Sequence, residues 1–373
     1  MILILMMRKK ASQVDLICVL LWAAVASVWK DCVESTDVVD LDVIIDMKME
    51  ADSGTITWEV CHDPTFNNYL EHLLPIDSFD FHHPFNVVPF ASLIQKQQLD
   101  GRGYSILTTF ESDPSRPAVF KGIDLRTYLN IYEDRPIIQE VAGFYHSLKL
   151  VDKMPRHKNM KAPPPTLVTL HRLSDEATML CGALEPFVSR GSLGDVIEQA
   201  NMAGERLGMA QKVDLCLQMA EAIAQTHLVA HTFHMDIKPG NLLIEDDGTL
   251  ALIDWEQNGV PPTTAAPEVD GTWDAELSAD GKLVYTKYKG PERSNMPEEA
   301  WGNMGWTKWN VLTLWQEQCP KALELAEVFS VGRSIHMLLR QPDTDGFDDI
   351  EDTLEMIEDW DECDDVQSHS SSL

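Results

Sequence analysis

The first half of the chain alternates apolar and polar residues in short runs that predict β-strands. Residues 38–48 and 54–60 are rich in β-branched and aromatic side chains, and the turn-forming sequence Asp52-Ser53-Gly54 lies between them. These two runs are therefore expected to form a β-hairpin. Further strands are predicted at residues 104–110, 118–121, 166–172, 179–186, 242–245 and 250–253.

Two longer stretches have the period of amphipathic helices, residues 135–150 and residues 207–229. In the second stretch, apolar side chains recur at Val213, Leu217 and Ile223. The chain thus runs from strands with one helix to helices with a small hairpin. That order predicts an α+β fold of two lobes, a β-rich small lobe and a mainly helical large lobe, with a cleft between them.

The 373-residue chain carries a formal net charge of −31 at pH 7, although its hydrophobic content of 44% is that of an ordinary globular protein. Such a charge excludes nucleic acid as a partner, because binding to the phosphate backbone depends on clustered lysine and arginine. It also disfavours an anionic membrane surface. A nucleotide site is compatible with it, since local cations, Mg²⁺ and backbone amides can hold phosphates in an acidic protein.

Seven cysteines lie scattered along the chain without a Cys-x-x-Cys pair. This pattern predicts free thiols in a reducing compartment, and hence a cytoplasmic or nuclear protein. Near the N-terminus, residues 17–28 form an apolar run. The run is shorter than the about 20 residues that span a bilayer, but it suits a signal-peptide core. A targeting or anchor segment and a packed helix both stay open, and a membrane partner is expected only if this run acts as an anchor.

The candidate chemistry lies in the sequence HMDIKPGN at residues 234–241 and in Asp254. Phosphoryl transfer requires a carboxylate that orients the nucleophile or accepts its proton, ligands for Mg²⁺, and cations for the developing charge. Asp236 supplies the carboxylate, and Lys238 follows where it can face the transferring phosphate. Asn241 and Asp254 supply hard oxygen ligands suited to magnesium. The short hairpin between these two residues is expected to bring them side by side.

This constellation resembles the catalytic and metal-binding loops of protein kinases, whose signature is H-R-D-x-K-P-x-N followed by D-F-G. The resemblance covers residues 88–340 and implies a domain that binds ATP and Mg²⁺. Lys121 lies where kinases have the lysine that contacts the α- and β-phosphates, and Glu140 where they have the glutamate that pairs with it. Glu185 opens the hinge segment, at which backbone groups would bind adenine.

Several positions depart from the kinase pattern. Only Gly101 and Gly103 represent the glycine-rich loop that covers the phosphates, so weak ATP binding is expected. Met235 replaces the arginine that holds a phosphorylated activation loop, which argues against switching by that phosphorylation. Trp255 follows the metal-binding aspartate in place of phenylalanine. Glu327 stands where an aspartate of the central helix usually holds the catalytic loop.

The resemblance continues towards the C-terminus. The sequence GPE at residues 290–292 resembles the kinase A-P-E element, and VFSVG at residues 328–332 resembles the start of the buried central helix of the large lobe. The acidic tail leaves little room for the last helices of that lobe, so a truncated large lobe is expected. The predicted segments are an N-terminal apolar segment at 1–35, a hairpin-containing extension at 36–85, the small lobe at 86–184, the large lobe at 185–340 and the acidic tail at 341–373.

Three functional hypotheses follow. The leading one is a protein kinase that transfers the γ-phosphate of Mg-ATP to a Ser or Thr hydroxyl of a protein substrate, and Lys238 favours this type within the family. The alternative is a small-molecule phosphotransferase, because IDWE at residues 253–256 is similar to a segment of aminoglycoside- and choline-kinase-like enzymes. The third is a pseudokinase interaction module, favoured by the poor glycine loop and disfavoured by the complete set of catalytic residues.

Overall fold

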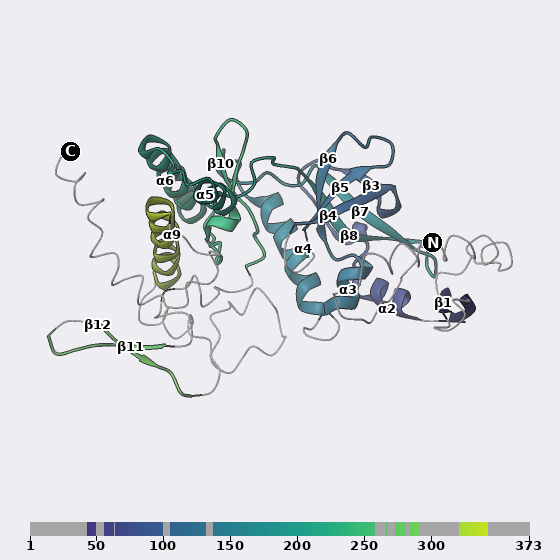
Figure 1. Ribbon diagram of the computed structural model, residues 1–373. Helices are drawn as coiled ribbons and strands as arrows, with labels where there is room; N and C mark the ends of the chain where they lie inside the picture. Colours follow the sequence, from purple (N-terminus) through teal and green to yellow (C-terminus); the bar gives the residue numbers. More distant parts are fainter. Residues whose placement is uncertain are drawn as a thin grey trace.

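The computed structural model describes residues 43–49, 56–62, 64–99, 105–131, 137–257, 266, 273–280, 283–290 and 321–341. Within these ranges the protein is an α+β fold with one mixed six-stranded sheet and several helices (Figure 1). The sheet lies at one end of the view in Figure 1 and most of the long helices lie at the other. This arrangement is compatible with two lobes.

The sheet contains half of the strands predicted from the sequence. Its strands are β3 (Asn86–Pro89), β4 (Leu93–Gln98), β5 (Ser105–Phe110), β6 (Pro117–Gly122), β7 (Thr166–Arg172) and β8 (Ala177–Pro186). Their spatial order is β3, β7, β8, β6, β5, β4, and only the β3–β7 pair is parallel. The four strands predicted here, β5 to β8, are confirmed to within one or two residues. Strand β4 escaped prediction because its residues are mostly polar and exposed.

A first core lies between the sheet and three helices, α2 (Thr65–His72), α3 (Leu125–Ile131) and α4 (Ile137–Lys153). Tyr69 on α2 is fully buried and donates its hydroxyl to the carbonyl of Ile123 (2.5 Å). Tyr145 on α4 donates to the carbonyl of Leu180 on β8 (2.7 Å). Helix α2 therefore belongs to the same core as the sheet, although the sequence analysis assigned it to an extension before the small lobe.

A second core lies between helices and a small hairpin. Its elements are α5 (Leu193–Met202), α6 (Met209–Ala224), β9 (Leu242–Ile244), β10 (Leu250–Leu252) and α9 (Ala322–Arg340). Helix α4 joins the two cores, because Tyr145 packs in the first and Val151, further along the helix, packs in the second. The site described below lies beside this helix.

The predicted helices and hairpins are largely confirmed. Helix α4 matches 135–150, and α6 with the π-helical turn η3 (Gln225–Val229) matches 207–229. Helix α9 begins six residues before the predicted start at 328, because small and buried residues already line one face of it at Ala322 and Ala326.

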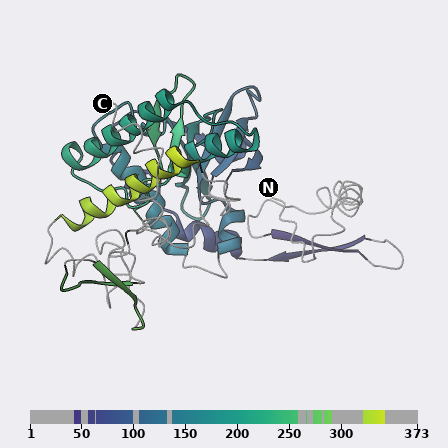
Figure 2. The ribbon, with the colours of Figure 1, turned by 60° about the vertical axis from the view of Figure 1, so that its left-hand side comes forward.

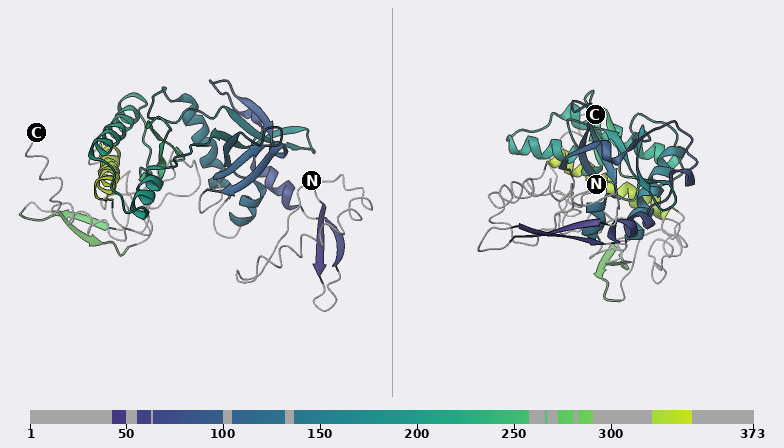
Figure 3. Two further views of the ribbon diagram at one scale, coloured as in Figure 1. Left: turned by 45° about the horizontal axis from the view of Figure 1, so that its top comes forward. Right: turned by 90° about the vertical axis from the view of Figure 1, so that its right-hand side faces the viewer.

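Two further hairpins project away from the cores (Figures 2 and 3). Strands β1 (Val43–Met49) and β2 (Ile56–His62) form the antiparallel hairpin predicted from the sequence. Strands β11 (Trp273–Leu277) and β12 (Leu283–Lys287) form one that was not predicted.

Several predictions concern residues outside the described ranges. Residues 17–28 and residues 342–373 are among them. Across the described ranges, no helix combines the length and the apolar character that a membrane crossing needs. Of the described cysteines, Cys181 and Cys216 are free thiols, as expected.

Candidate active site

An open cavity lies between the sheet, α4 and the segment after β10. Lys121 from β6, Glu140 from α4, Glu185 from β8, and Asp254 and Glu256 after β10 all line it. Four of the residues predicted to contact the nucleotide or the metal are thus brought together around one cavity, from segments far apart in the sequence.

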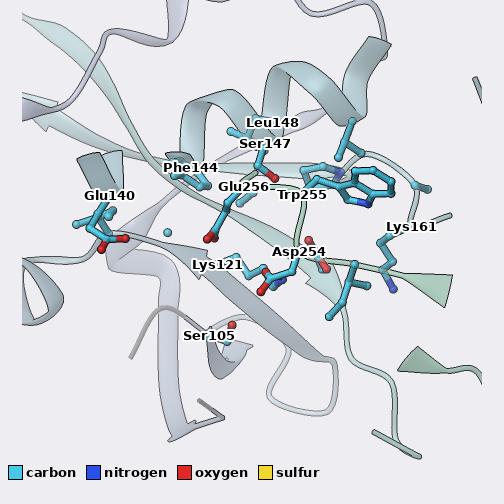
Figure 4. A pocket seen from close by; sticks show the side chains of 18 residues that line it. Ser105, Lys121, Glu140, Phe144, Ser147, Leu148, Lys161, Asp254, Trp255 and Glu256 are labelled. Carbon is cyan, nitrogen blue, oxygen red and sulfur yellow. The ribbon is translucent and has the colours of Figure 1, made fainter. Parts of the chain in front are cut away.

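Lys121 and Asp254 form an ion pair across this cavity, with 2.9 Å between Nζ and Oδ1. Figure 4 shows the two side chains pointing toward each other. Burial alone would lower the pKa of the Lys121 ammonium, but the carboxylates of Asp254 and Glu185 raise it well above its usual value. Lys121 therefore stays protonated and is a fixed positive charge in the cleft.

Glu140 was the expected partner of Lys121, and the ion pair found for Lys121 is with Asp254. Glu140 is buried and lines the same cavity. The backbone of Asp254 is left-handed (φ 72°). Such a conformation is rare outside glycine and clusters at functional sites.

The candidate catalytic loop, residues 234–241, folds back on itself. Pro239 begins a 3₁₀ turn, η4 (Pro239–Asn241), which brings Asn241 back onto Asp236. The amide nitrogen of Asn241 donates to the carbonyl of Asp236 (2.7 Å) and to its Oδ2 (3.0 Å). The Nζ of Lys238 lies 3.2 Å from the same Oδ2. A lysine and an amide thus both hold one oxygen of the Asp236 carboxylate.

Asn241 also lies beside the metal-binding candidate Asp254. The backbone nitrogen of Ile253 donates to the carbonyl of Asn241 (3.0 Å), so the two chain segments run next to each other. Because the amide nitrogen of Asn241 is used by Asp236, its amide oxygen is the atom that could bind a cation.

His234 contacts the backbone of both Ile253 and Asp236, and these two partners fix the tautomer of its ring. Its Nε2 lies 2.6 Å from the carbonyl of Ile253, and its Nδ1 lies 3.2 Å from the backbone nitrogen of Asp236. A carbonyl can only accept and a backbone N–H can only donate, so the proton sits on Nε2 and the ring is neutral. The ring also packs edge-on against Trp255 (4.6 Å between centroids).

Glu327 on α9 also contacts this loop, at the position where the sequence departs from the aspartate of the kinase pattern. Its Oε1 accepts from the backbone nitrogens of His234 and Met235, the latter at 2.5 Å. Its Oε2 lies 2.6 Å from Nε2 of His227, in the π-helical turn η3. With 2% of its surface exposed, Glu327 is a buried carboxylate whose two oxygens are both occupied.

The oxygen donors of the site fit magnesium. Mg²⁺ is usually held by one or two carboxylates together with waters and substrate phosphates. The Asn241 amide oxygen and the Asp254 carboxylate make up such a set. Within the described ranges, no cluster of three or more His, Cys, Asp or Glu residues suited to a metal is found.

Other site predictions have different outcomes. Gly101 and Gly103 lie outside the described residues, as do Pro291 and Glu292 of the GPE sequence. Glu185 was expected to contribute backbone groups, but its side chain also lines the cavity. The contribution of Lys161 to the cavity was missed, since nothing in its proline-rich loop marks it as a site residue.

In comparisons with known proteins, no protein-family model matches this chain, and no curated protein matches it. The geometry of the site therefore carries the functional argument.

Proposed function

We propose that the protein is a phosphotransferase with a protein-kinase-like fold, which transfers the γ-phosphate of Mg-ATP to a Ser or Thr hydroxyl of a protein substrate. The observation that carries this proposal is the Asp236 carboxylate. Lys238 and Asn241 both contact its Oδ2, while its Oδ1 is buried and has no hydrogen-bond donor among the described residues. A buried carboxylate oxygen favours a donor, and a substrate hydroxyl would supply one.

The arrangement around the cavity supports the same reaction. In protein kinases a lysine on the third strand of the small lobe and a glutamate on the following long helix belong to the ATP site. Lys121 lies on the third of the consecutive strands β4, β5 and β6, and Glu140 lies on α4. Both line the cavity that Asp254 closes.

The residues would divide the reaction between them. Asp236 would orient the attacking hydroxyl and take its proton as the new oxygen–phosphorus bond forms and the bond to ADP breaks. Lys238 and Lys121 would offset negative charge on the transferring phosphate and the nucleotide phosphates, respectively. Asn241 and Asp254 would hold Mg²⁺, which when bound neutralises charge on the phosphate oxygens.

A small-molecule phosphotransferase is the second candidate. The observation that favours it is Glu256, which lines the cavity directly after Asp254 and Trp255. A small alcohol as acceptor would use the same Asp236 and Asp254, so the two candidates differ in acceptor and not in chemistry.

The test is phosphoryl transfer by the purified full-length chain with Mg-ATP, offered a peptide library and a panel of small alcohols. We expect transfer to Ser/Thr peptides, and a loss of at least about 100-fold in Asp236→Asn and in Asp254→Asn. Asp152→Asn is the matched control, since Asp152 is a buried carboxylate bound by His82 and His83 away from the cavity.

Transfer to alcohols alone would favour the small-molecule enzyme. Binding of neither nucleotide nor magnesium by a folded sample, measured as a melting shift, would favour an interaction module. Transfer undiminished in a folded Asp254→Asn variant would remove that residue from the mechanism.

A further inference from the structure

Gln257 lies three residues after Asp254, in a segment where the chain turns twice. Both residues have a left-handed backbone, with φ of 72° at Asp254 and 54° at Gln257. Side-chain contacts must offset the strain of such a conformation. At Gln257 those contacts are hydrogen bonds.

Both ends of the Gln257 amide are occupied, and each end reaches a different segment. Its Nε2 donates to Oγ1 of Thr232 (3.0 Å) and to the carbonyl of Phe233, just before the catalytic loop. Its Oε1 lies 2.6 Å from Nε2 of His146 on α4. One side chain thus joins the segment after Asp254, the segment before Asp236, and the helix that lines the cavity.

A second contact nearby is apolar. Met235, 2% exposed, packs in a small cluster with Ala266 and Ala326. Kinases that the sequence resembles carry an arginine at the position of Met235, where it holds a phosphorylated segment. Here a thioether packs against an alanine of the segment after Asp254, so the contact needs no phosphate group.

We infer that Gln257 is a positioning residue, which fixes Asp254 relative to Asp236 and to α4 without phosphorylation of the segment that follows. The inference rests on the proposed phosphoryl transfer. Asp254 would hold the magnesium and Asp236 the hydroxyl, so their separation sets the alignment of the reacting atoms. A misplacement of about 1 Å in such an alignment can lower a rate about 100-fold.

Two substitutions separate the contacts. Gln257→Glu keeps an acceptor for His146 but loses both donated hydrogen bonds, and His146→Phe loses only the bond to α4. We expect kcat to fall about 10- to 100-fold in Gln257→Glu and by less in His146→Phe. The KM for ATP should stay within about 3-fold of wild type, because neither side chain lines the cavity. If the two residues acted independently, the double variant would lose kcat by the product of the two single effects. Because the two residues contact each other, we expect a smaller loss than that product.

The matched control is Gln218→Leu. Gln218 is a nearly buried amide that joins Asn159 to the backbone of Leu250, away from the catalytic loop. We expect its loss to lower the melting temperature but to leave kcat unchanged where the protein is folded. If kcat and KM change alike in Gln257→Glu and in this control, Gln257 acts only through general stability and the inference is wrong.

A readout that does not depend on activity is hydrogen exchange of the backbone amides of the full chain without nucleotide. We expect faster exchange at residues 232–236 and 253–257 in Gln257→Glu and not in Gln218→Leu. Unchanged exchange there would overturn the inference, even if the wild-type chain transfers no phosphate and the proposed function fails. Treatment of the wild type with a non-specific protein phosphatase should leave kcat within about 2-fold, and loss of activity would overturn the independence from phosphorylation.

Discussion

The contact between Glu327 and the candidate catalytic loop gives the sharpest prediction, because it involves one buried carboxylate and three donors. Glu327→Ala removes the acceptor of the backbone nitrogens of His234 and Met235 and of the ring nitrogen of His227. A buried donor left without an acceptor costs about 1–3 kcal/mol. Three donors lose this acceptor, so we expect Glu327→Ala to lower the free energy of unfolding by at least about 3 kcal/mol.

Glu327→Gln should be much milder. The amide oxygen of glutamine can still accept from both backbone nitrogens, and its NH₂ group can donate to His227 once that ring carries its proton on Nδ1. We expect a loss of about 1 kcal/mol, from the weaker neutral hydrogen bonds. Denaturant unfolding monitored by fluorescence measures both values, and an unchanged m-value would show that the same transition is compared.

The control on the same helix is Glu324→Gln. Glu324 is partly exposed and lies 3.6 Å from Lys321, so its loss should cost less than about 0.5 kcal/mol. If Glu327→Ala costs under about 1 kcal/mol, or no more than Glu324→Gln, then α9 does not hold the catalytic loop in the way the structure describes.

Three further predictions concern other parts of the chain. Lys121→Met should lower the rate of phosphoryl transfer at least about 100-fold. It should cost only about 1 kcal/mol of stability, because the ion pair of Lys121 with Asp254 is partly exposed. A transfer rate equal to wild type would contradict the role of Lys121. Gly122→Ala should lower the free energy of unfolding by about 2–3 kcal/mol, since a Cβ there would lie 2.3 Å from the carbonyl oxygen of Cys181. Gly332→Ala is the control and should be neutral or stabilising, because there is open space around Gly332. Urea unfolding measures both variants. Burial alone would raise the pKa of Asp152, but hydrogen bonds from His82 and His83 lower this pKa to about 2. The stability that the Asp152 carboxylate contributes is therefore present above about pH 4 and is lost as the pH falls toward 2. The difference in unfolding free energy between Asp152→Asn and wild type should vanish over that range.

The sequence predicted most reliably what local spacing decides. Residues 166–172 were predicted as a strand and form β7, and residues 207–229 have the helical period of α6. The approach of Asn241 to Asp254 is of the same kind, because the short hairpin between them was expected to bring the two residues side by side. These features depend on residues that lie close together in the sequence.

Features that depend on long-range packing could not be predicted in the same way. Lys121 was assigned to Glu140, but it binds Asp254, which is 133 residues away in the sequence. Which carboxylate comes nearest depends on how the end of β10 packs against β6. The contact of His227 with Glu327 comes from a π-helical turn directly after α6, where a regular helical continuation was predicted. Side-chain types were therefore predicted better than their partners.

The charge of the chain and the chemistry of the cavity are connected. Four carboxylates and two lysines line the cavity, namely Glu140, Glu185, Asp254, Glu256, Lys121 and Lys161. A nucleotide triphosphate that entered alone would add its own negative charge to a cleft in which carboxylates already outnumber ammonium groups. A divalent cation changes that balance, because it binds carboxylate and phosphate oxygens together. We therefore expect the proposed nucleotide to bind in this acidic cavity only together with magnesium.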